Sequence, residues 1–260
     1  MHLISECEPL ISICIPAYDM GGKGAIFLDS TLATVAAQDY SNYEVIIADQ
    51  ARGGFLNDVC KKWSAHFDLV RVETSHLIGR SSVNCNAAMR AARGNIIKIL
   101  FQDDLMCKTN ALSMIAEAFK SQRRRWLLCG AGQTEDGTTV KRSMIPYMHA
   151  QIRFGKNTVS SPSVLAFEAG HGLMFDENLV WLMDVEFYHR IACEFGDPAI
   201  LKDTLVLNRE HESQVSNNLS LKVKKDELRY VRNKFRSSEI FIDFYEYCRQ
   251  LLKLFKKGLF

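Results

Sequence analysis

The sequence predicts an α/β protein built on a single, mostly parallel sheet that is flanked by helices. Short apolar segments alternate with segments of helical periodicity from residue 10 to about residue 122. Such alternation is typical of parallel strands joined by crossover helices. The chain also lacks a linker rich in Gly, Pro or Ser that would divide it into independent domains, and its 260 residues can bury a sizeable core.

In the first half of the chain, each expected strand is a short apolar run, and each expected helix carries apolar residues three and four positions apart. Gly94 is expected to cap the third helix. In chain order we expect a strand over 10–17, a helix over 25–38, a strand over 43–49, a helix over 53–67, a strand over 69–73, a helix over 81–93, a strand over 95–101 and a helix over 110–121.

After about residue 130 the pattern becomes irregular, which indicates a mixed region. We expect extended strands and loops over 130–150, a loop feeding a strand over 157–167, a helix over 181–195 that begins near Asp184, a strand over 200–208 and a helical tail. The expected organisation is one domain over 1–220, with halves of about 10–130 and 131–220, and a tail over 221–260.

The composition argues against several classes of protein. Apolar residues make up 47% of the chain and charged residues 24%, and the formal net charge is only +2, so nucleic acid is not an expected partner. None of the eight cysteines forms a C-x-x-C pair, which suits a reducing compartment better than a disulfide framework. With no signal-like opening and no long apolar run, we expect a cytoplasmic protein.

The most informative segment is the apolar run 96–101, which is followed by Gln102, Asp103 and Asp104. Open α/β sheets bind ligands beyond the carboxyl ends of their strands. Two carboxylates at such an end need a divalent cation or a basic partner. The alternative is a turn that only ends the strand, because Asp favours turns and helix starts.

Five segments, in order over about residues 10–212, resemble the inverting family 2 glycosyltransferases of the GT-A fold. No single segment is specific for this family, but the occurrence of all five in the family's order is strong support for the resemblance. They are Ile13–Tyr18, Tyr43–Asp49, Ser81–Asn86 with Ala92–Ile96 after it, Asp103–Asp104, and an acceptor-side segment made of Ser161–Leu165, Phe175–Glu177 and Met183–Phe187.

The resemblance implies a Rossmann-like GT-A sheet and transfer of a sugar from a nucleoside diphosphate, with a UDP-sugar favoured, to a glycan or lipid-linked acceptor. It implies Mn²⁺ or Mg²⁺ as cofactor, with Asp104 and His211 as metal ligands. Asp184 would be the general base, with Glu186 as the backup. The donor-binding residues would be Pro16, Ala17, Tyr18, Asp49, Arg80, Asn86, Gln102 and Asp103.

Two positions depart from the family pattern. Phe101 stands where the family often has a further Asp, and Gln50 follows Asp49 where the family commonly continues with Gly-Ser. The metal site would then depend on one direct carboxylate together with diphosphate oxygens. The choice of nucleotide base is also left open.

Several alternatives stand beside these assignments. Asp184 could be a first-turn helix acid, Arg80 a solvated surface residue and His211 a surface residue in a polar loop. A sugar nucleotidyltransferase would need a phosphate-binding loop, for which 21–24 is a weak candidate because it lacks the usual helix-opening context. A catalytically degenerate nucleotide- or carbohydrate-binding module is the third interpretation.

The tail 241–260 is a basic amphipathic helix by its pattern. Such a helix can lie on an anionic membrane, or it can pack on the protein with its lysines in water. Packing is slightly favoured. Peripheral contact with the cytoplasmic face of a membrane remains a hypothesis, which rests partly on the resemblance to enzymes that act on lipid-linked glycans. The apolar residues of the helix are Phe241, Phe244, Tyr245, Cys248, Leu251, Leu252, Phe255 and Leu259.

Overall fold

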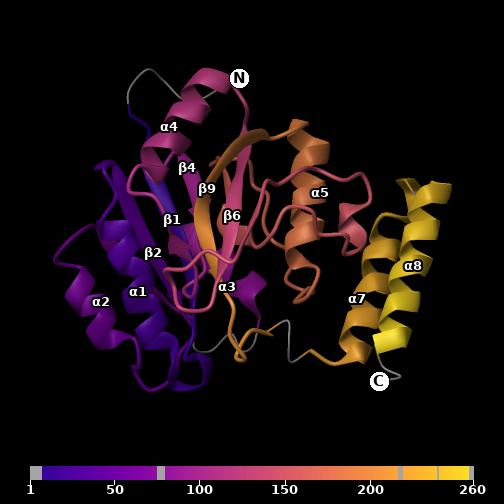
Figure 1. The fold of residues 1–260 in the computed structure, drawn as a ribbon, viewed down its shortest axis with the longest axis horizontal. Coiled ribbons are helices and arrows are strands. Elements are labelled where there is room, and N and C mark those ends of the chain that lie inside the picture. The colour runs from indigo at the N-terminus through magenta and orange to yellow at the C-terminus, as the bar shows by residue number, and fades with distance from the viewer. Residues whose placement is uncertain (1–7, 75–79, 216–218, 239, 258–260) are drawn as a thin grey trace.

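A computed structural model describes residues 8–74, 80–215, 219–238 and 240–257 of the chain. Its centre is a nine-stranded mixed sheet with the order β3-β2-β1-β4-β8-β6-β9-β5, and β7 pairs with β6. Helices flank the sheet, and a helical pair stands beyond α5 at the right of Figure 1. The predicted α/β class is confirmed.

The first half of the sheet consists of parallel strands in the order β3-β2-β1-β4. These strands are β1 (Ile11–Ala17), β2 (Tyr43–Asp49), β3 (Leu69–Glu73) and β4 (Ile96–Ile99). Both β1 and β4 are buried throughout, which explains their nearly unbroken apolar sequences. Their parallel direction brings the carboxyl ends of β1, β2 and β4 to one edge, as the sequence predicted.

Four helices follow or connect these strands: α1 (Gly24–Ala36), α2 (Asn57–Trp63), α3 (Ser81–Ala91) and α4 (Ala111–Gln122). The expected helix over 53–67 is wrong at its start. Gly53 and Gly54 both have φ of +74°, so the chain turns before α2 begins. The strand expected over 95–101 is also shorter, because the chain leaves the sheet after Ile99.

Gly94 does not cap α3, which ends where Ala92 adopts extended backbone. Its own role is a close approach to β1. The Gly94 amide donates to Ser12 Oγ over 2.8 Å, and a Cβ on Gly94 would lie 2.5 Å from that same oxygen. A side chain at this position would therefore collide with the first strand.

The second half of the sheet is mixed. Strand β8 pairs antiparallel with β4 and with β6, while β9 runs parallel to β6 and antiparallel to β5. The two-residue strand β5 was not predicted, since it is too short to show a period. The strands are β5 (Leu105–Met106), β6 (Trp126–Thr134), β7 (Arg142–Met144), β8 (Leu165–Glu168) and β9 (Ala199–Arg209).

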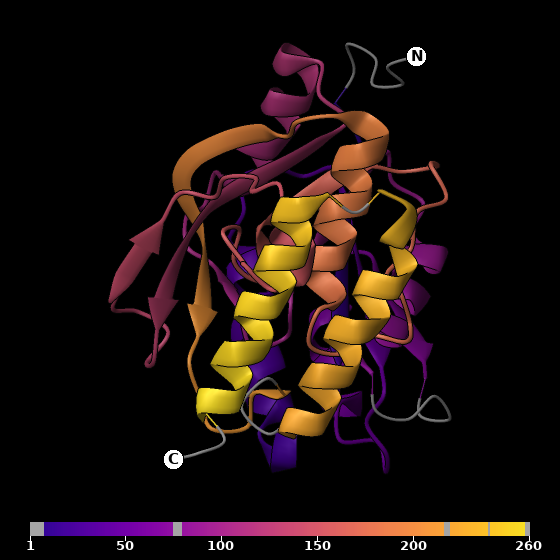
Figure 2. The same cartoon turned by 90° about the vertical axis from the view of Figure 1, so that its right-hand side faces the viewer.

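The remaining helices lie beside this second half. Helices α7 and α8 pack against each other, and both contact η2, which also contacts α5. Figure 2 shows α7 and α8 facing the viewer with α5 behind them. Packing of the tail on the domain is thus what the structure shows, whereas the boundary at residue 220 stays a prediction. The elements are α5 (Met183–Phe195), α7 (Leu221–Lys234), α8 (Phe241–Lys257), and the 3₁₀ turns η1 (Met20–Gly22), η2 (Ile152–Phe154), η3 (Pro162–Val164) and η4 (Arg236–Ser238).

Candidate active site

A cleft opens at the carboxyl ends of β1 and β4 and reaches the first turn of α5. Parts of the chain far apart in sequence line it. The first half contributes Pro16, Tyr18, Met20, Gln50, Ser81, Asn84, Phe101, Gln102, Asp103 and Asp104, and the second half contributes Ser161, Pro162, Val180, Trp181, Met183, Asp184, Asn208, Gln214 and Val215.

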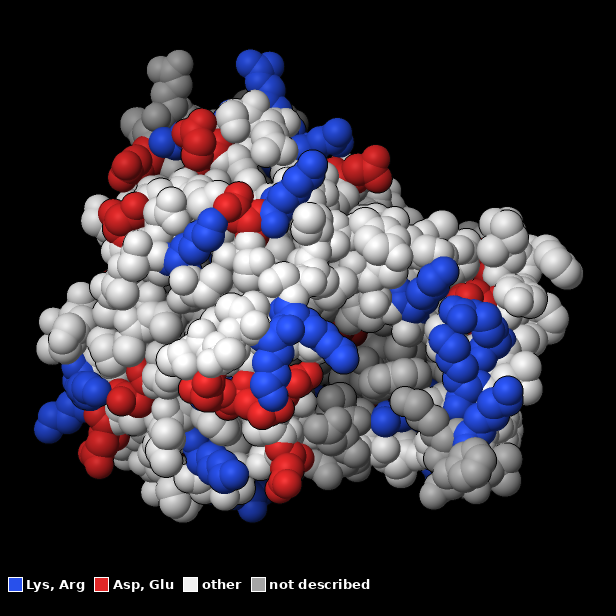
Figure 3. Space-filling view, viewed as in Figure 1, with Lys and Arg blue, Asp and Glu red and all other residues white. Residues whose placement is uncertain are grey.

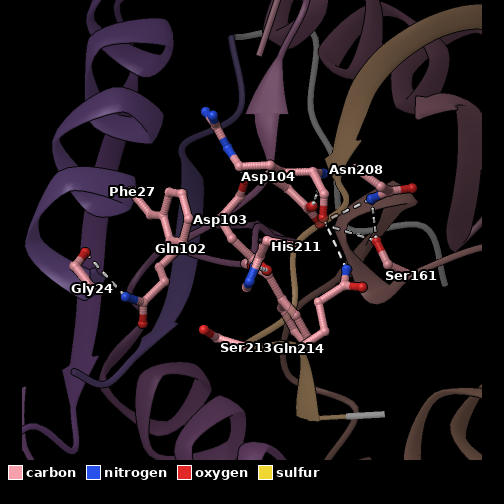
Figure 4. A network of polar contacts seen from close by, with 12 residues as sticks. Gly24, Phe27, Gln102, Asp103, Asp104, Ser161, Asn208, His211, Ser213 and Gln214 are labelled. Carbon is pink, nitrogen blue, oxygen red and sulfur yellow. Dashed lines mark hydrogen bonds and ion pairs between the residues drawn. The ribbon is translucent and has the colours of Figure 1, made fainter. Parts of the chain in front are cut away.

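Asp104 lies 4% exposed at the floor of the cleft. Its Oδ2 accepts hydrogen bonds from Ser161 Oγ, Ser163 Oγ and Asn208 Nδ2, and its Oδ1 accepts one from the amide of Arg209 (Figure 4). Burial, and then the charge of Asp103, raise the pKa of Asp104 to about 7, although these hydrogen bonds act in the opposite direction. The carboxylate of Asp104 is thus engaged by the protein itself.

Asp103, rather than Asp104, contacts the predicted metal ligand His211. The Nε2 atom of His211 lies 2.9 Å from Asp103 Oδ2, and the imidazole ring packs against Phe27 with 4.8 Å between ring centroids. In Figure 4, the His211 ring lies beside Asp103, between Phe27 and Gln214. The structure therefore places the carboxylate of Asp103 beside His211, whereas Asp104 contacts serine and asparagine side chains; a metal-ligand role for Asp104 remains a prediction.

Asp49 ends β2 with its side chain fully buried. Its Oδ1 accepts the amide of Ala51, and its Oδ2 accepts Arg71 Nε over 2.8 Å. The Arg71 guanidinium therefore fixes the carboxylate. Asp49 does not line the cleft, but its neighbour Gln50 does. A role for Asp49 in donor binding remains a prediction.

The loop after β1 is hydrogen-bonded to the segment between β4 and β5, which carries the two aspartates. The Gln102 amide accepts from the backbone N–H of Tyr18 and donates to the carbonyl oxygens of Tyr18 and Gly24. Pro16, Tyr18 and Gln102 line the cleft, whereas Ala17 is fully buried and does not, and donor binding by these residues remains a prediction. Burial, and then the negative charge of Asp103, raise the pKa of Tyr18 to about 12, so its hydroxyl remains protonated.

Asn84, rather than the predicted Asn86, faces the cleft. Asn84 donates to the carbonyl of Ala17 and accepts from Thr74 Oγ1. Asn86 instead forms two hydrogen bonds with the backbone of Phe175, which fastens α3 to the second half. Because residues two apart on a helix point in different directions, only one of the two asparagines can face the ligand.

Arg80 is likewise absent from the described lining of the cleft. Its guanidinium donates to the carbonyl of Glu177 over 2.6 Å, so it crosses from the start of α3 to the second half of the chain. The adjacent Ser81 lines the cleft instead.

Asp184 faces the cleft from the first turn of α5. Asn157 Nδ2 donates to its Oδ2 over 3.0 Å, and the amide of Val185 donates to its Oδ1 over 2.8 Å. Burial raises the pKa of Asp184 to about 7, despite the hydrogen bonds from the backbone that lower it. A carboxylate with this pKa is suited to accept a proton at neutral pH.

Glu186, the predicted backup, points elsewhere. It is fully buried, and its carboxylate accepts hydrogen bonds from Arg190 and pairs with Lys234 of α7. It does not line the cleft. The two acids are two positions apart on α5, so they cannot share a direction.

One residue that contacts the segment before the candidate base Asp184 could not be predicted from the sequence. Glu227 of α7 accepts the backbone N–H groups of Val180, Trp181 and Leu182, each over 2.9 Å. Those amides precede α5, where unpaired donors accumulate. A lone glutamate in a basic helix carries no local signal of such a contact. The serines 161 and 163, by contrast, lie in a segment that the resemblance already included.

No cluster of three or more His, Cys, Asp or Glu side chains that could hold a metal occurs in the part of the chain that the structure describes. Within the same residues, no helix is long and apolar enough to cross a membrane. The candidate for metal binding is the carboxylate of Asp103, which lines the cleft, together with the imidazole of His211, which contacts Asp103 but is not among the lining residues.

The chain belongs to the glycosyl transferase family 2, whose model matches residues 12–182. It is similar to the O-antigen biosynthesis protein RfbC of Myxococcus xanthus, with 29% identity over 122 residues, 46% of this chain and 9% of that protein. It is also similar to the uncharacterized protein y4gI of Sinorhizobium fredii, with 26% identity over 155 residues, 58% of this chain and 17% of that protein. The chain thus matches only a small part of these much longer relatives.

Solved structures show the same GT-A fold. S. aureus TarS 1–349 in complex with UDP-GlcNAc matches with a TM-score of 0.71 and 17% identity, over 94% of this chain and 71% of that one. The mannosyltransferase PcManGT of Pyrobaculum calidifontis, in complex with GDP-Man and Mn²⁺, matches with a TM-score of 0.63 and 15% identity, over 96% and 70%. The expected family and fold are therefore confirmed.

Proposed function

We propose that this protein transfers a sugar, with inversion, from a nucleoside diphosphate donor to a hydroxyl group of a glycan or lipid-linked acceptor. One observation carries the proposal. Asp184 from the second half of the chain, whose pKa is raised to about 7, lines one cleft together with Asp103 from the first half, and His211 contacts Asp103. A base and a separate site for the leaving group are what such a transfer needs.

In the proposed reaction, Asp184 accepts the proton of the acceptor hydroxyl. The acceptor oxygen forms a bond to the anomeric carbon from the face opposite the diphosphate, and the bond from that carbon to the diphosphate oxygen breaks. The nucleoside diphosphate leaves with the bonding electrons. Asn157, which donates to Asp184 Oδ2, holds the carboxylate in one orientation during proton transfer.

The side chains present fit a divalent cation bound with the donor. Asp103 offers a carboxylate oxygen and His211 an imidazole nitrogen, a mixed set that suits Mn²⁺ better than Mg²⁺. Such an ion would neutralise charge on the departing diphosphate, whose oxygens and water would complete its coordination. Complexes of structurally similar proteins with UDP-GlcNAc and with GDP-Man and Mn²⁺ support this choice, and the former favours a UDP-sugar.

The proposal is tested by calorimetric titration with UDP, GDP and dTDP, with and without Mn²⁺. We expect one nucleotide to bind with Mn²⁺ and much more weakly without it. Asp103→Asn should remove the metal dependence, since it removes the ligand beside His211. Asp104→Asn is the matched control for the metal dependence of nucleotide binding. Its expected effect is on the free energy of unfolding, which it should lower by about 1–3 kcal/mol through lost hydrogen bonds. No nucleotide binding by the folded protein would overturn the proposal in favour of a degenerate binding module.

We also propose that α8 contacts an anionic membrane surface. Four apolar side chains, Phe241, Tyr245, Leu252 and Phe255, are 53–83% exposed along one side of this helix. Their spacing puts them opposite the buried side, which carries Tyr247. Basic side chains gather over α7 and α8 on the face seen in Figure 3. Apolar area beside basic charge is what an interfacial helix presents.

Sedimentation with vesicles of phosphatidylcholine, with or without phosphatidylglycerol, tests this contact. We expect binding that requires the anionic lipid and weakens with salt. The double variant Tyr245→Glu, Leu252→Glu should lose it while its unfolding curve stays unchanged, because both side chains are exposed. Binding of this variant at the level of the unchanged protein would contradict the proposal.

A further inference from the structure

One wall of the cleft is apolar and lies next to the candidate base. Val180, Trp181 and Met183 immediately precede Asp184, and all three line the cleft. Exposed apolar surface on a cleft wall is normally retained for a ligand that covers it. An aromatic ring in this position offers a flat surface for the apolar face of a ligand.

The position of Trp181 is fixed by contacts from two sides. Its backbone N–H donates to the Glu227 carboxylate, and so do those of both neighbouring residues. The indole lies close to Gly155, since a Cβ built on that glycine would be in van der Waals contact with the ring at 3.5 Å. The Lys224 ammonium lies 5.9 Å from the ring centroid. The backbone of Trp181 is therefore held by Glu227, and its indole lies near Gly155 and Lys224.

The charge of the cleft selects against an anionic acceptor. The charged residues that line it are the three aspartates 103, 104 and 184, and no Lys or Arg lines it among the residues that the structure describes. The negative charge of the donor's diphosphate would be neutralised by the proposed cation, which the pair Asp103–His211 would bind. A phosphate group on the acceptor near Asp184 would face these aspartates, and the Lys224 ammonium near Trp181 is not among the residues that line the cleft, so a phosphate is disfavoured.

We infer that the acceptor is a neutral sugar whose ring stacks on the indole of Trp181 and presents a hydroxyl group to Asp184. This inference rests on the proposed function and specifies its acceptor: the terminal sugar of a glycan, rather than a phosphate-bearing polyol or the phosphate of a lipid carrier. Trp181 is then a specificity-determining residue that touches the substrate.

The three tryptophans of the chain allow a direct binding test. Trp63 and Trp126 are 8% and 0% exposed and lie outside the lining of the cleft. A change in emission on adding a cleft ligand therefore reports on Trp181. The probes are methyl glycosides of glucose, galactose, mannose, rhamnose and N-acetylglucosamine, compared with glucose 1-phosphate, galactose 1-phosphate and glycerol 3-phosphate, all with UDP and Mg²⁺ present.

We expect at least one neutral glycoside to change the emission in a saturable way, and the phosphates to leave it unchanged. The response should vanish in Trp181→Phe. By calorimetry, Trp181→Phe should retain most of the glycoside affinity, whereas Trp181→Ala should weaken it roughly tenfold. Tyr147→Ala, which removes an exposed aromatic ring outside the lining of the cleft, is the control and should change neither the emission response nor the glycoside affinity.

The outcomes separate the two proposals. Loss of UDP binding by the folded protein would defeat the proposed function. If UDP binds but no glycoside changes the emission, or if the phosphates alone do so, the inference about the acceptor is overturned and the proposed function stands. A response that persists in Trp181→Phe would also overturn it.

Discussion

At the scale of single residues, environment separates acids that look alike in sequence. Asp184 and Glu186 lie in the same helical turn, yet one faces the cleft and the other is fully buried among Arg190 and Lys234. Burial raises the pKa of Asp184 to about 7. Burial without a cation raises the pKa of a carboxyl group, and this is what suits Asp184 to act as a base.

We predict that the rate of transfer increases with pH through about pH 7, because Asp184 must be deprotonated to accept a proton. Asp184→Asn should lower kcat by a factor of about 10²–10⁴ and leave UDP affinity unchanged. Rates of UDP release at several pH values, combined with calorimetry, check both parts. Asp58→Asn, an exposed acid on α2, is the control, and turnover retained in Asp184→Asn would remove Asp184 from its role.

The same pKa shift predicts a change in stability. The pKa of Asp184 is raised from 3.8 to about 7 on folding, so the unfolded chain releases this proton first as pH increases. Asp184 therefore costs stability progressively from about pH 4 to pH 7, and the cost stays constant above that. Asp184→Asn should raise the melting temperature more at pH 8 than at pH 4. An equal shift at both pH values would contradict the raised pKa.

At the scale of elements, α7 contacts both α5, the helix that carries the proposed base Asp184, and the segment before it. Glu227 supplies one carboxylate to three amides that precede α5, and Lys234 reaches Glu186 within α5. A segment predicted as a separate tail thus takes part in shaping the cleft. Neither contact is visible in the periodicity of α7, because each depends on which helix lies opposite.

We predict that Glu227→Ala lowers the free energy of unfolding by about 1–3 kcal/mol, since it leaves three amides without their acceptor. It should also lower kcat while UDP affinity is retained, because the wall of the cleft with Asp184 loses its support. Glu117→Ala, which removes an exposed acid from α4, is the control. Denaturant titration and steady-state kinetics provide the measurements, and an unchanged kcat would show that the contact is only structural.

At the scale of the whole molecule, a buried ion pair joins α8 to the rest of the chain. Arg153 of η2 and Asp243 of α8 lie 2.8 Å apart, and their side chains are 5% and 4% exposed. The Arg153 guanidinium also lies over the ring of Phe235. Breaking such a pair by removing one charge leaves the other buried and unpaired.

Asp243→Asn is therefore expected to lower the free energy of unfolding by roughly 3 kcal/mol. A double variant, Arg153→Met with Asp243→Leu, should recover much of this loss because no charge remains buried. Asp29→Asn, which breaks an exposed pair with Lys62, should cost no more than about 1 kcal/mol. Urea titration of the three variants checks the order, and equal losses for Asp243→Asn and Asp29→Asn would contradict it.

The sequence by itself determined the local structure and the class of chemistry. It placed β2 and β3 at their observed bounds and β1 within one residue, because buried strands and amphipathic helices leave local patterns. It also located two carboxylates at the end of β4 and the acid at the start of α5. It missed β5, whose two residues cannot show a period.

Only the tertiary structure decided which side chains each of the two adjacent aspartates, Asp103 and Asp104, contacts. Asp104 is held by Ser161, Ser163 and Asn208, which are 57, 59 and 104 positions away, whereas Asp103 meets His211 at 108 positions. Adjacent residues that leave a strand point to different sides, and distant segments of the chain define those sides. Direction, burial and pKa follow from packing, and no local pattern encodes them.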